Sequence, residues 1–122
     1  MILSAGVGSR IRPLTDNCPK TLLTVGGIRI IERMLKNIQA CGIDEIVIVI
    51  GYLHGQIEIF VRDTFPELNV QFIINNRFAE TNTGYSLMLA ADFVAGSDFV
   101  KFDGDVVFEE NVLRRLLASE DD

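Results

Sequence analysis

The residues best suited to chemistry lie near the start of this sequence, where glycines alternate with cations. Gly6 and Gly8 follow a short apolar run, Arg10 comes next, and Lys20 closes the stretch. Glycine adopts backbone conformations barred to other residues and lets the main chain approach a ligand closely. Successive N–H groups turned toward one point bind an anion, and guanidinium and ammonium groups strengthen such a site. The segment therefore predicts a cradle for a triphosphate.

Two commoner glycine motifs do not fit this segment. The dinucleotide-binding pattern GxGxxG requires a third glycine where this chain has Ile11, and the P-loop pattern GxxxxGK[ST] has no match in the sequence. A glycine pair alone is most often a simple turn. Arg10, the stretch 12–15 and Lys20 follow the pair in the order of the opening signature of the nucleotidyltransferases, which this segment resembles, and that resemblance favours the phosphate cradle over a turn.

A second group of chemically capable residues stands near the other end of the sequence. Asp103, Gly104 and Asp105 follow an apolar run, so we expect them at the carboxyl end of a strand. Such a triplet by itself is most often a β-turn. Carboxylates beside a phosphate cradle, however, suit a hard cation, because Mg²⁺ is commonly held by one or two carboxylates plus substrate phosphates. Asp105 is the candidate Mg²⁺ ligand.

The loop at residues 80–84 is a third candidate. It contains more amide, hydroxyl and glycine than a simple connection needs. One interpretation is a turn followed by a helix cap, with Asn82 or Thr83 as the capping residue. The other is that Asn82 and Gly84 contact the edge of a nucleotide base. The residues alone leave both open.

Composition sets the class of protein. The chain has 122 residues, 48% of them hydrophobic, which is enough for one domain with a single core. Its net charge of −6 argues against a nucleic-acid partner. Six of the 11 Lys and Arg residues, but two of the 17 Asp and Glu residues, lie in residues 1–36. An acidic protein that concentrates its cations beside the glycine loop suits a small polyanionic ligand.

We expect a soluble, cytoplasmic protein without a membrane partner. The sequence has no signal peptide and no apolar run near the ~20 residues that a membrane helix requires. Cys18 and Cys41 do not have the spacing of a metal or disulfide motif, so reduced thiols are the simpler interpretation. His54 is expected as an exposed residue at a helix start, with no obvious partner. The oligomeric state stays open and allows a homo-oligomer.

Hydrophobic periodicity predicts alternating strands and helices. We expect strands at residues 1–3, 45–50, 69–75 and 98–103, and helices at 28–41, 56–65, 85–93 and 111–118. The run at 45–50 is β-branched throughout its apolar part, as in a strand that is buried on both faces. The last helix should bury Val112, Leu116 and Leu117. Residues 120–122 read as a frayed acidic tail.

This order predicts an α/β fold, a doubly wound, Rossmann-like and mostly parallel sheet with helices on both faces. In the usual strand order 3-2-1-4, the first and last strands are neighbours, and ligands bind beyond their carboxyl ends. The glycine loop should therefore lie beside Asp103 and Asp105. Lys101 conflicts with this scheme, because it places a charge in a strand that is expected to be buried.

Three segments resemble a known enzyme family. The opening residues 1–10 (MILSAGVGSR), residues 18–22 (CPKTL) and residues 103–105 (DGD) are similar to motifs of the sugar-1-phosphate nucleotidyltransferases and phosphocholine cytidylyltransferases. The likeness extends along essentially all 122 residues. Residues 85–87 resemble the phosphocholine branch, while Thr83 and Gly84 are similar to the sugar branch. Ser4 departs from the alanine that is common in the family.

The resemblance implies specific roles. Arg10 and the loop backbone would bind the β- and γ-phosphates, Lys20 would neutralise the reacting phosphates, and Asp105 would hold Mg²⁺. The residues implied to bind nucleotide are Ala5, Gly6, Gly8, Ser9, Asn82 and Gly84. Family members are longer than this chain, and their later half supplies an acceptor pocket. We therefore expect that residues 1–122 form the N-terminal nucleotide-binding part of a truncated nucleotidyltransferase domain.

The implied reaction transfers a nucleoside monophosphate from an NTP to a phosphorylated sugar or amino-alcohol and releases pyrophosphate. The attacking phosphate oxygen is already anionic, so no general base is needed. An alternative is a nucleotide-binding regulatory module of the same fold without chemistry. A redox dinucleotide-binding domain is less favoured because the third glycine is missing. The sequence leaves the base and the acceptor undetermined.

Overall fold

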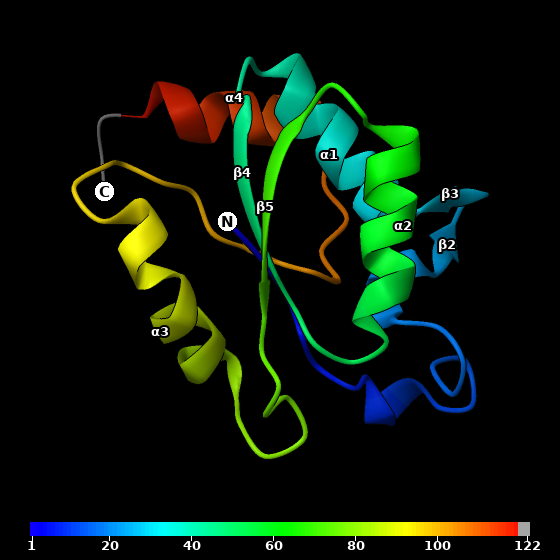
Figure 1. The fold of residues 1–122 in the computed structure, drawn as a ribbon. Helices are drawn as coiled ribbons and strands as arrows, with labels where there is room; N and C mark the ends of the chain where they lie inside the picture. The colour runs from blue at the N-terminus through cyan, green and yellow to red at the C-terminus, as the bar shows by residue number, and fades with distance from the viewer. Residues whose placement is uncertain (120–122) are drawn as a thin grey trace.

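The computed structural model describes residues 1–119, and the acidic tail expected at 120–122 lies outside them. Its main sheet is parallel throughout, with the strand order β5-β4-β1-β6 (Figure 1). The strands are β1 (Ile2–Ser4), β4 (Glu45–Ile50), β5 (Asn69–Ile74) and β6 (Phe102–Asp103). If the four strands of this sheet alone are numbered along the chain, their order is 3-2-1-4. The predicted strand order is therefore confirmed.

Strand β1 is the centre of the arrangement. Ile2 is paired with Ile48 of β4 on one side and with Phe102 of β6 on the other. The apolar run in β4 is buried as predicted, with Ile48 and Val49 fully enclosed on opposite faces of the sheet. The first and last strands are therefore direct neighbours, although most of the chain separates them in sequence.

A small hairpin replaces the expected start of the first helix. Strands β2 (Thr24–Val25) and β3 (Ile28–Arg29) are antiparallel, and helix α1 (Ile30–Ala40) begins only after them. Gly26 and Gly27 form the turn with φ of 62° and 80°. Two consecutive residues with positive φ are what a tight hairpin turn requires, and glycine provides them. The prediction of a helix from residue 28 was therefore wrong, because residues 28 and 29 belong to the second strand of this hairpin.

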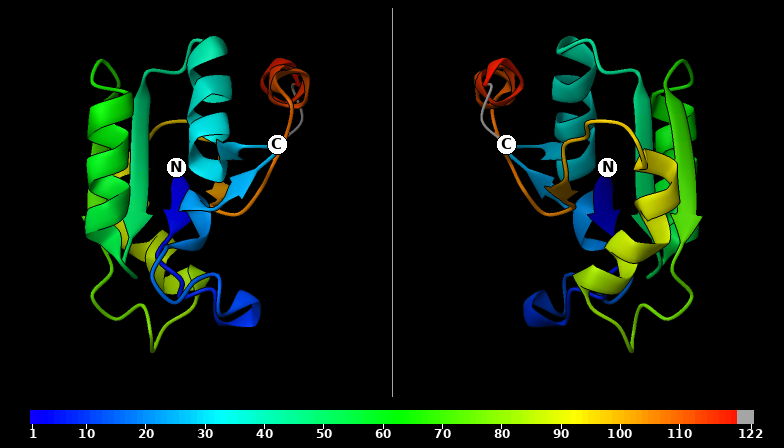
Figure 2. Two further views of the ribbon diagram at one scale, coloured as in Figure 1. Left: turned by 90° about the vertical axis from the view of Figure 1, so that its right-hand side faces the viewer. Right: turned by 90° about the vertical axis from the view of Figure 1, so that its left-hand side faces the viewer.

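Helices cover both faces of the sheet, as predicted (Figures 1 and 2). Helices α1, α2 (His54–Thr64) and α4 (Glu110–Ala118) contribute to the core on one face. Helix α3 (Thr83–Val94) packs alone among the described helices on the other. Gly42, with φ of 80°, follows the C-cap residue of α1 and takes the left-handed conformation that commonly ends a helix.

The C-terminal part differs from expectation in two places. Strand β6 contains only Phe102 and Asp103, so Lys101 lies before it and is exposed. The positive charge of Lys101, which conflicted with the prediction of a buried strand at residues 98–103, therefore lies outside the strand. In α4 the buried residue is Leu113, whereas the predicted face of Val112, Leu116 and Leu117 is 58%, 53% and 43% exposed. That prediction of the buried face was wrong.

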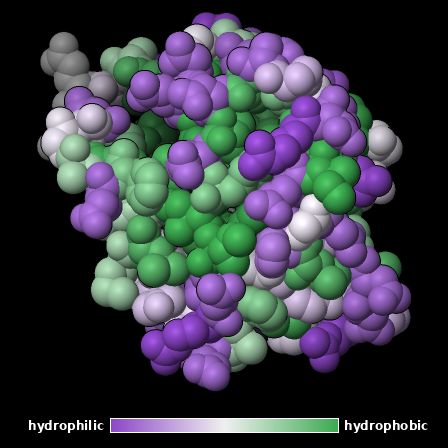
Figure 3. All heavy atoms as spheres, viewed as in Figure 1, coloured by the Kyte–Doolittle hydropathy of each residue, from purple (hydrophilic) through white to green (hydrophobic). Residues whose placement is uncertain are grey.

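The two faces of the sheet have cores of unequal size. The larger core contains the buried residues Ile2, Leu22, Ile30, Ile31, Met34, Leu35, Ile38, Ile46, Ile48, Ile50, Ile57, Val61, Phe65 and Leu113. The smaller core, under α3, contains Leu3, Ala5, Val49 and Ala90. Hydrophobic side chains are also visible over β5 and toward α3 on the surface (Figure 3). Helix α3 is therefore attached through a small apolar contact.

Candidate functional site

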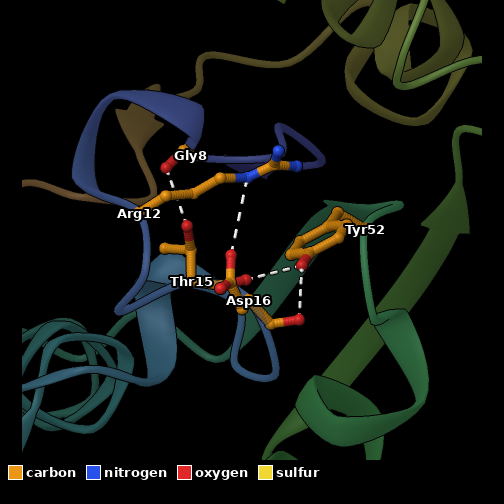
Figure 4. Close-up of polar contacts among 5 residues, drawn as sticks. All are labelled: Gly8, Arg12, Thr15, Asp16 and Tyr52. Atoms are coloured by element: carbon orange, nitrogen blue, oxygen red, sulfur yellow. Dashed lines mark hydrogen bonds and ion pairs between the residues drawn. The ribbon is translucent and has the colours of Figure 1, made fainter.

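The glycine loop leaves the carboxyl end of β1 and is fixed by its own later residues. Gly8 has φ of 67°, in the left-handed region that favours glycine. A Cβ atom there would lie 3.0 Å from Cγ2 of Thr15, a contact so tight that the Thr15 side chain would have to shift. The hydroxyl of Thr15, itself fully buried, donates a hydrogen bond of 2.8 Å to the carbonyl of Gly8 (Figure 4). Both the positive φ and the closeness of the Thr15 side chain therefore favour glycine at position 8.

Residues after β4 hold the far side of this loop. The phenol of Tyr52 lies 2.5 Å from the carbonyl oxygen of Thr15 and 3.0 Å from that of Asp16 (Figure 4). Gln56, in α2, donates a hydrogen bond of 3.0 Å to the carbonyl of Asn17. The loop between the glycines and Lys20 is thereby tied to the body of the molecule at successive points, which preserves its shape.

Gly104 joins the Asp-Gly-Asp segment tightly to β1. Its N–H donates a hydrogen bond of 2.9 Å to the carbonyl of Leu3. A Cβ atom on Gly104 would lie 2.0 Å from Oγ of Ser4, so no other residue fits without movement. Because Gly104 is fixed against the strand that feeds the glycine loop, Asp103 and Asp105 are carried to the same edge of the sheet.

These segments line an open cavity of about 530 Å³. It is lined by Leu3, Ser4, Gly6, Gly8, Lys20, Thr21, Thr83, Lys101, Asp103, Gly104 and Asp105. The glycine loop, the short helix η2 (Lys20–Leu22), the start of α3 and the end of β6 thus meet at one place. The sequence prediction that the glycine loop lies beside the two aspartates agrees with this arrangement.

Each aspartate of the cavity has a lysine partner. Nζ of Lys20 lies 2.7 Å from Oδ2 of Asp105, and Nζ of Lys101 lies 3.5 Å from Oδ1 of Asp103. The hydrogen bond from Lys20 lowers the pKa of the Asp105 carboxyl below its ordinary value; partial burial opposes this shift, and the positive charge of Lys20 adds to it. The cavity therefore brings two lysine and two aspartate side chains together beside the glycine loop.

The structure brings four of the predicted site residues to the cavity, namely Gly6, Gly8, Lys20 and Asp105. Gly6 is not held in a strained conformation, contrary to the expectation for both glycines. A Cβ atom on Gly6 would meet nothing within 4 Å, so its missing side chain leaves open space at the cavity. Of the two loop glycines, Gly8 is the one that needs the special backbone freedom of glycine.

The other predicted site residues do not line the cavity. Ala5 is buried beneath it, and its carbonyl accepts a hydrogen bond of 3.1 Å from the N–H of Tyr52. Ser9 and Arg10 lie in the exposed short helix η1 (Ser9–Ile11), directly after Gly8. Asn82 is the N-cap of α3, and its Oδ1 accepts a hydrogen bond of 3.4 Å from the N–H of Tyr85. Gly84 follows in the first turn.

Several lining residues were not among the predicted site residues. Ser4 and Thr21 each carry a buried hydroxyl oxygen without a hydrogen-bond partner among the described residues. Thr83 and Lys101 also reach the cavity. A signal for three of them was present in the sequence, since Ser4 and Thr21 lie inside segments that resemble the family and Thr83 lies in the polar loop at residues 80–84. The expectation that His54 lacks a partner was wrong, because its Nδ1 lies 3.2 Å from Oε2 of Glu58.

The fold and the cavity together define a class of protein. A family-wide description of the nucleotidyl transferases matches residues 1–121, and the chain belongs to this family. No helix among the described residues has the length and apolar character needed to span a membrane.

Individual relatives refine this placement. The chain is 33% identical over 118 residues to a choline-phosphate cytidylyltransferase of Streptococcus pneumoniae, which covers 97% of this chain and 49% of the relative. It is 38% identical over 112 residues to the choline-phosphate cytidylyltransferase of Haemophilus influenzae, which covers 92% of this chain and 46% of the relative. The chain thus spans about half the length of the curated relatives it matches.

Solved structures agree in fold. The CTP:phosphocholine cytidylyltransferase of Streptococcus pneumoniae superposes with a TM-score of 0.78 at 34% identity, over 89% of this chain and 46% of that one. An inositol-1-phosphate CTP transferase of T. maritima gives a TM-score of 0.83 over 99% of this chain and 48% of that one. Its 22% identity supports the fold alone. The Rossmann-like α/β architecture is therefore shared with nucleotidyltransferases.

Proposed function

We propose that this chain is the nucleotide-binding part of an enzyme that transfers a nucleoside monophosphate from an NTP to a phosphorylated sugar or amino-alcohol and releases pyrophosphate. The observation that carries the proposal is the meeting of Gly8, Lys20 and Asp105 in one cavity. An anion cradle, a cation and a carboxylate are the groups that a metal-bound triphosphate requires.

The chain offers positioning and charge neutralisation and needs no base. An oxygen of the acceptor phosphate attacks the α-phosphorus, the bond between that phosphorus and the bridging oxygen breaks, and pyrophosphate leaves with the electron pair. No proton has to be removed from a nucleophile that is already anionic. Lys20 would lie against the charge that develops on the phosphates, and the backbone beside Gly8 would hold the triphosphate in line. Arg10, exposed on η1, would add a cation at the mouth of the site.

The donor groups of the cavity fit Mg²⁺. The described residues contain no cluster of three or more metal-ligating side chains, so a cage made only of protein groups is not available there. The carboxylates of Asp103 and Asp105 suit instead a cation that takes its other ligands from phosphates and water. Asp105, our candidate ligand, would hold the ion. When bound, Mg²⁺ would supply neutralisation of the negative charge on the transferring phosphates.

CTP is the nucleotide we propose, with a phosphorylated amino-alcohol as acceptor. The support is that two relatives at 33% and 38% identity are choline-phosphate cytidylyltransferases. A titration of the chain with CTP, UTP, dTTP, GTP and ATP, each with and without Mg²⁺, tests this assignment calorimetrically. We expect CTP to bind tightest and only with the metal. Equal affinity for all five nucleotides would contradict the choice of CTP.

Two variants test the roles of the charged residues. Asp105→Asn should remove the Mg²⁺ dependence of nucleotide binding, whereas Asp98→Asn, an exposed control, should leave it unchanged. In the full-length protein, Lys20→Ala should lower turnover, measured as pyrophosphate release with phosphocholine, by more than it lowers nucleotide affinity. Lys36→Ala, which changes an exposed lysine of α1, is the control. Unaltered turnover in folded Lys20→Ala would remove Lys20 from the reaction. Selective CTP binding by the full-length protein without turnover on any acceptor would favour the regulatory module instead.

A further inference from the structure

The start of α3 forms one wall of the cavity, and it has little apolar support. Thr83, the first residue of the helix, lines the cavity, while Asn82 caps the same end. Only Ser86 and Ala90 of α3 are buried. A single buried alanine methyl group contributes far less than a buried leucine or isoleucine. The position of this wall must therefore depend on something other than the core.

A buried amide at the end of β5 supplies that support. The side chain of Asn75, whose residue is 1% exposed, donates hydrogen bonds of 3.1 Å to Oγ1 of Thr81 and 3.1 Å to Oγ of Ser86. Its Oδ1 accepts a hydrogen bond of 2.9 Å from the N–H of Arg77. The Asn75 side chain thus contacts Arg77 near the start of the loop between β5 and α3, Thr81 near its end, and Ser86 in the first turn of α3.

Asn75 is itself rigidly held. Its backbone N–H donates a hydrogen bond of 2.7 Å to the carbonyl of Ile50 at the end of β4. The loop gains a further internal bond, because the hydroxyl of Thr81 donates to the carbonyl of Arg77 at 2.7 Å. Unpaired buried polar groups are costly, so this network has one arrangement in which its bonds are made. This hydrogen-bond network connects the end of β4, through Asn75, to the first turn of α3.

We propose that Asn75 is a positioning residue for nucleotide discrimination, acting through the wall that Thr83 and its neighbours form. This rests on the proposed function. The cations and the glycine loop serve the triphosphate, whereas α3 presents Thr83, a neutral hydroxyl-bearing residue, to the cavity, and a neutral polar surface suits a nucleoside. Displacement of this wall should change the choice between bases without changing the affinity for the phosphates alone.

The test compares Asn75→Ala with the wild-type chain in two titrations. One uses CTP and UTP with Mg²⁺, and the other uses inorganic tripolyphosphate with Mg²⁺, which can occupy only the phosphate end. We expect Asn75→Ala to bind CTP about 10-fold more weakly, a loss of about 1.4 kcal/mol, with a reduced preference for CTP over UTP. Tripolyphosphate affinity should stay within about two-fold. Asn69→Ala, which removes an exposed amide at the other end of β5, is the matched control.

A milder variant keeps the test decisive if Asn75→Ala fails to fold. Ser86→Ala removes one bond to Asn75 and retains the other two, so it should reduce the CTP preference by a smaller factor. If the wild-type chain binds no triphosphate, the proposed function fails and this inference falls with it. If the wild type is selective and both folded variants keep that selectivity, the inference alone is overturned. An equal loss of tripolyphosphate affinity would show general damage and would also overturn it.

Discussion

The two faces of the sheet are built differently. One is covered by α1, α2 and α4 over a wide aliphatic core, whereas the other is covered among the described helices by α3 alone, over Leu3, Ala5, Val49 and Ala90. Helix α3 also leaves Met88 and Phe93 61% and 55% exposed. The first face supplies stability, and the second carries a wall of the candidate site. The difference indicates that this wall is located mainly by hydrogen bonds.

The largest effect is expected from Ile48→Ala on the wide core. Ile48 is fully buried, and removal of its side chain leaves a cavity that packed neighbours cannot close. The free energy of unfolding should fall by about 3–4 kcal/mol in urea denaturation. Ile59→Ala, at a position that is 64% exposed on α2, is the control and should change it by less than about 0.5 kcal/mol. A small loss for Ile48→Ala would mean that the wide core does not dominate stability.

The next effect concerns Val49→Ala, one residue further along β4 and facing α3. Val49 is also fully buried, but fewer apolar groups surround it. We expect a loss of about 2 kcal/mol by the same measurement, from the removed methyl groups and a small cavity. If Val49→Ala destabilises the chain as much as Ile48→Ala does, the two faces are equally well packed and the contrast between them is wrong.

A smaller effect is expected from the cap of α3. Asn82→Ala removes the side-chain acceptor for the N–H of Tyr85. Because that bond is long at 3.4 Å, and the backbone carbonyl of Asn82 still accepts from the same N–H at 3.2 Å, the loss should be about 0.5–1 kcal/mol. Amide hydrogen exchange should increase at the first turn of α3 and not in α1. Asn76→Ala, in the same loop and exposed, provides the comparison. Uniform exchange changes across both helices would contradict a local cap.

Met88→Gln tests the outer surface of α3. The side chain is exposed, so the free energy of unfolding should change by no more than about 0.5 kcal/mol. A large destabilisation would show that this outer surface is packed in solution, and α3 would then have an apolar anchor that the small core does not reveal. Thermal unfolding monitored by circular dichroism is sufficient for this comparison.

The smallest effect is expected at the ion pair between Lys20 and Asp105. The pair is partly exposed, so its contribution to stability is small because solvent screens it. The lowered pKa of Asp105 means that this contribution is present above the ordinary carboxyl pKa and is lost as pH falls through the lowered value. Lys20→Met should raise the Asp105 pKa toward its ordinary value in a carboxyl ¹³C NMR titration. An unchanged pKa would mean that the pair does not form in solution.

Strand order could be predicted because the pattern of the sequence was strong. The β-branched run in β4 and the alternation of strands with helices point to a parallel sheet, and chain topology then puts β1 beside β6. Gly8 and Lys20 were identifiable for a similar reason, since their residue types stand in one local motif. The juxtaposition with Asp105 followed from the fold alone.

The remaining features depend on tertiary contacts that periodicity does not encode. The apolar periodicity predicts a helix from residue 28, but Gly26 and Gly27, with positive φ, form a hairpin turn that makes residues 28–29 a strand. In α4, Leu113 is buried because only its side of the helix meets α1, which no local pattern shows. Asn75 has no motif signal at all. Its importance appears only when Thr81 and Ser86 are seen around it.

The hydrogen bond between Gly104 and Leu3 has a consequence for the time course of synthesis. Lys20 and Asp105 are 85 positions apart, so at about 5–20 residues per second a ribosome needs roughly 4–17 seconds to pass from one to the other. During that interval β1 has no β6 beside it, and the carbonyl of Leu3 has no Gly104 to bind. The cavity therefore cannot form until residue 105 has been synthesised, by which time most residues of the larger core have been synthesised.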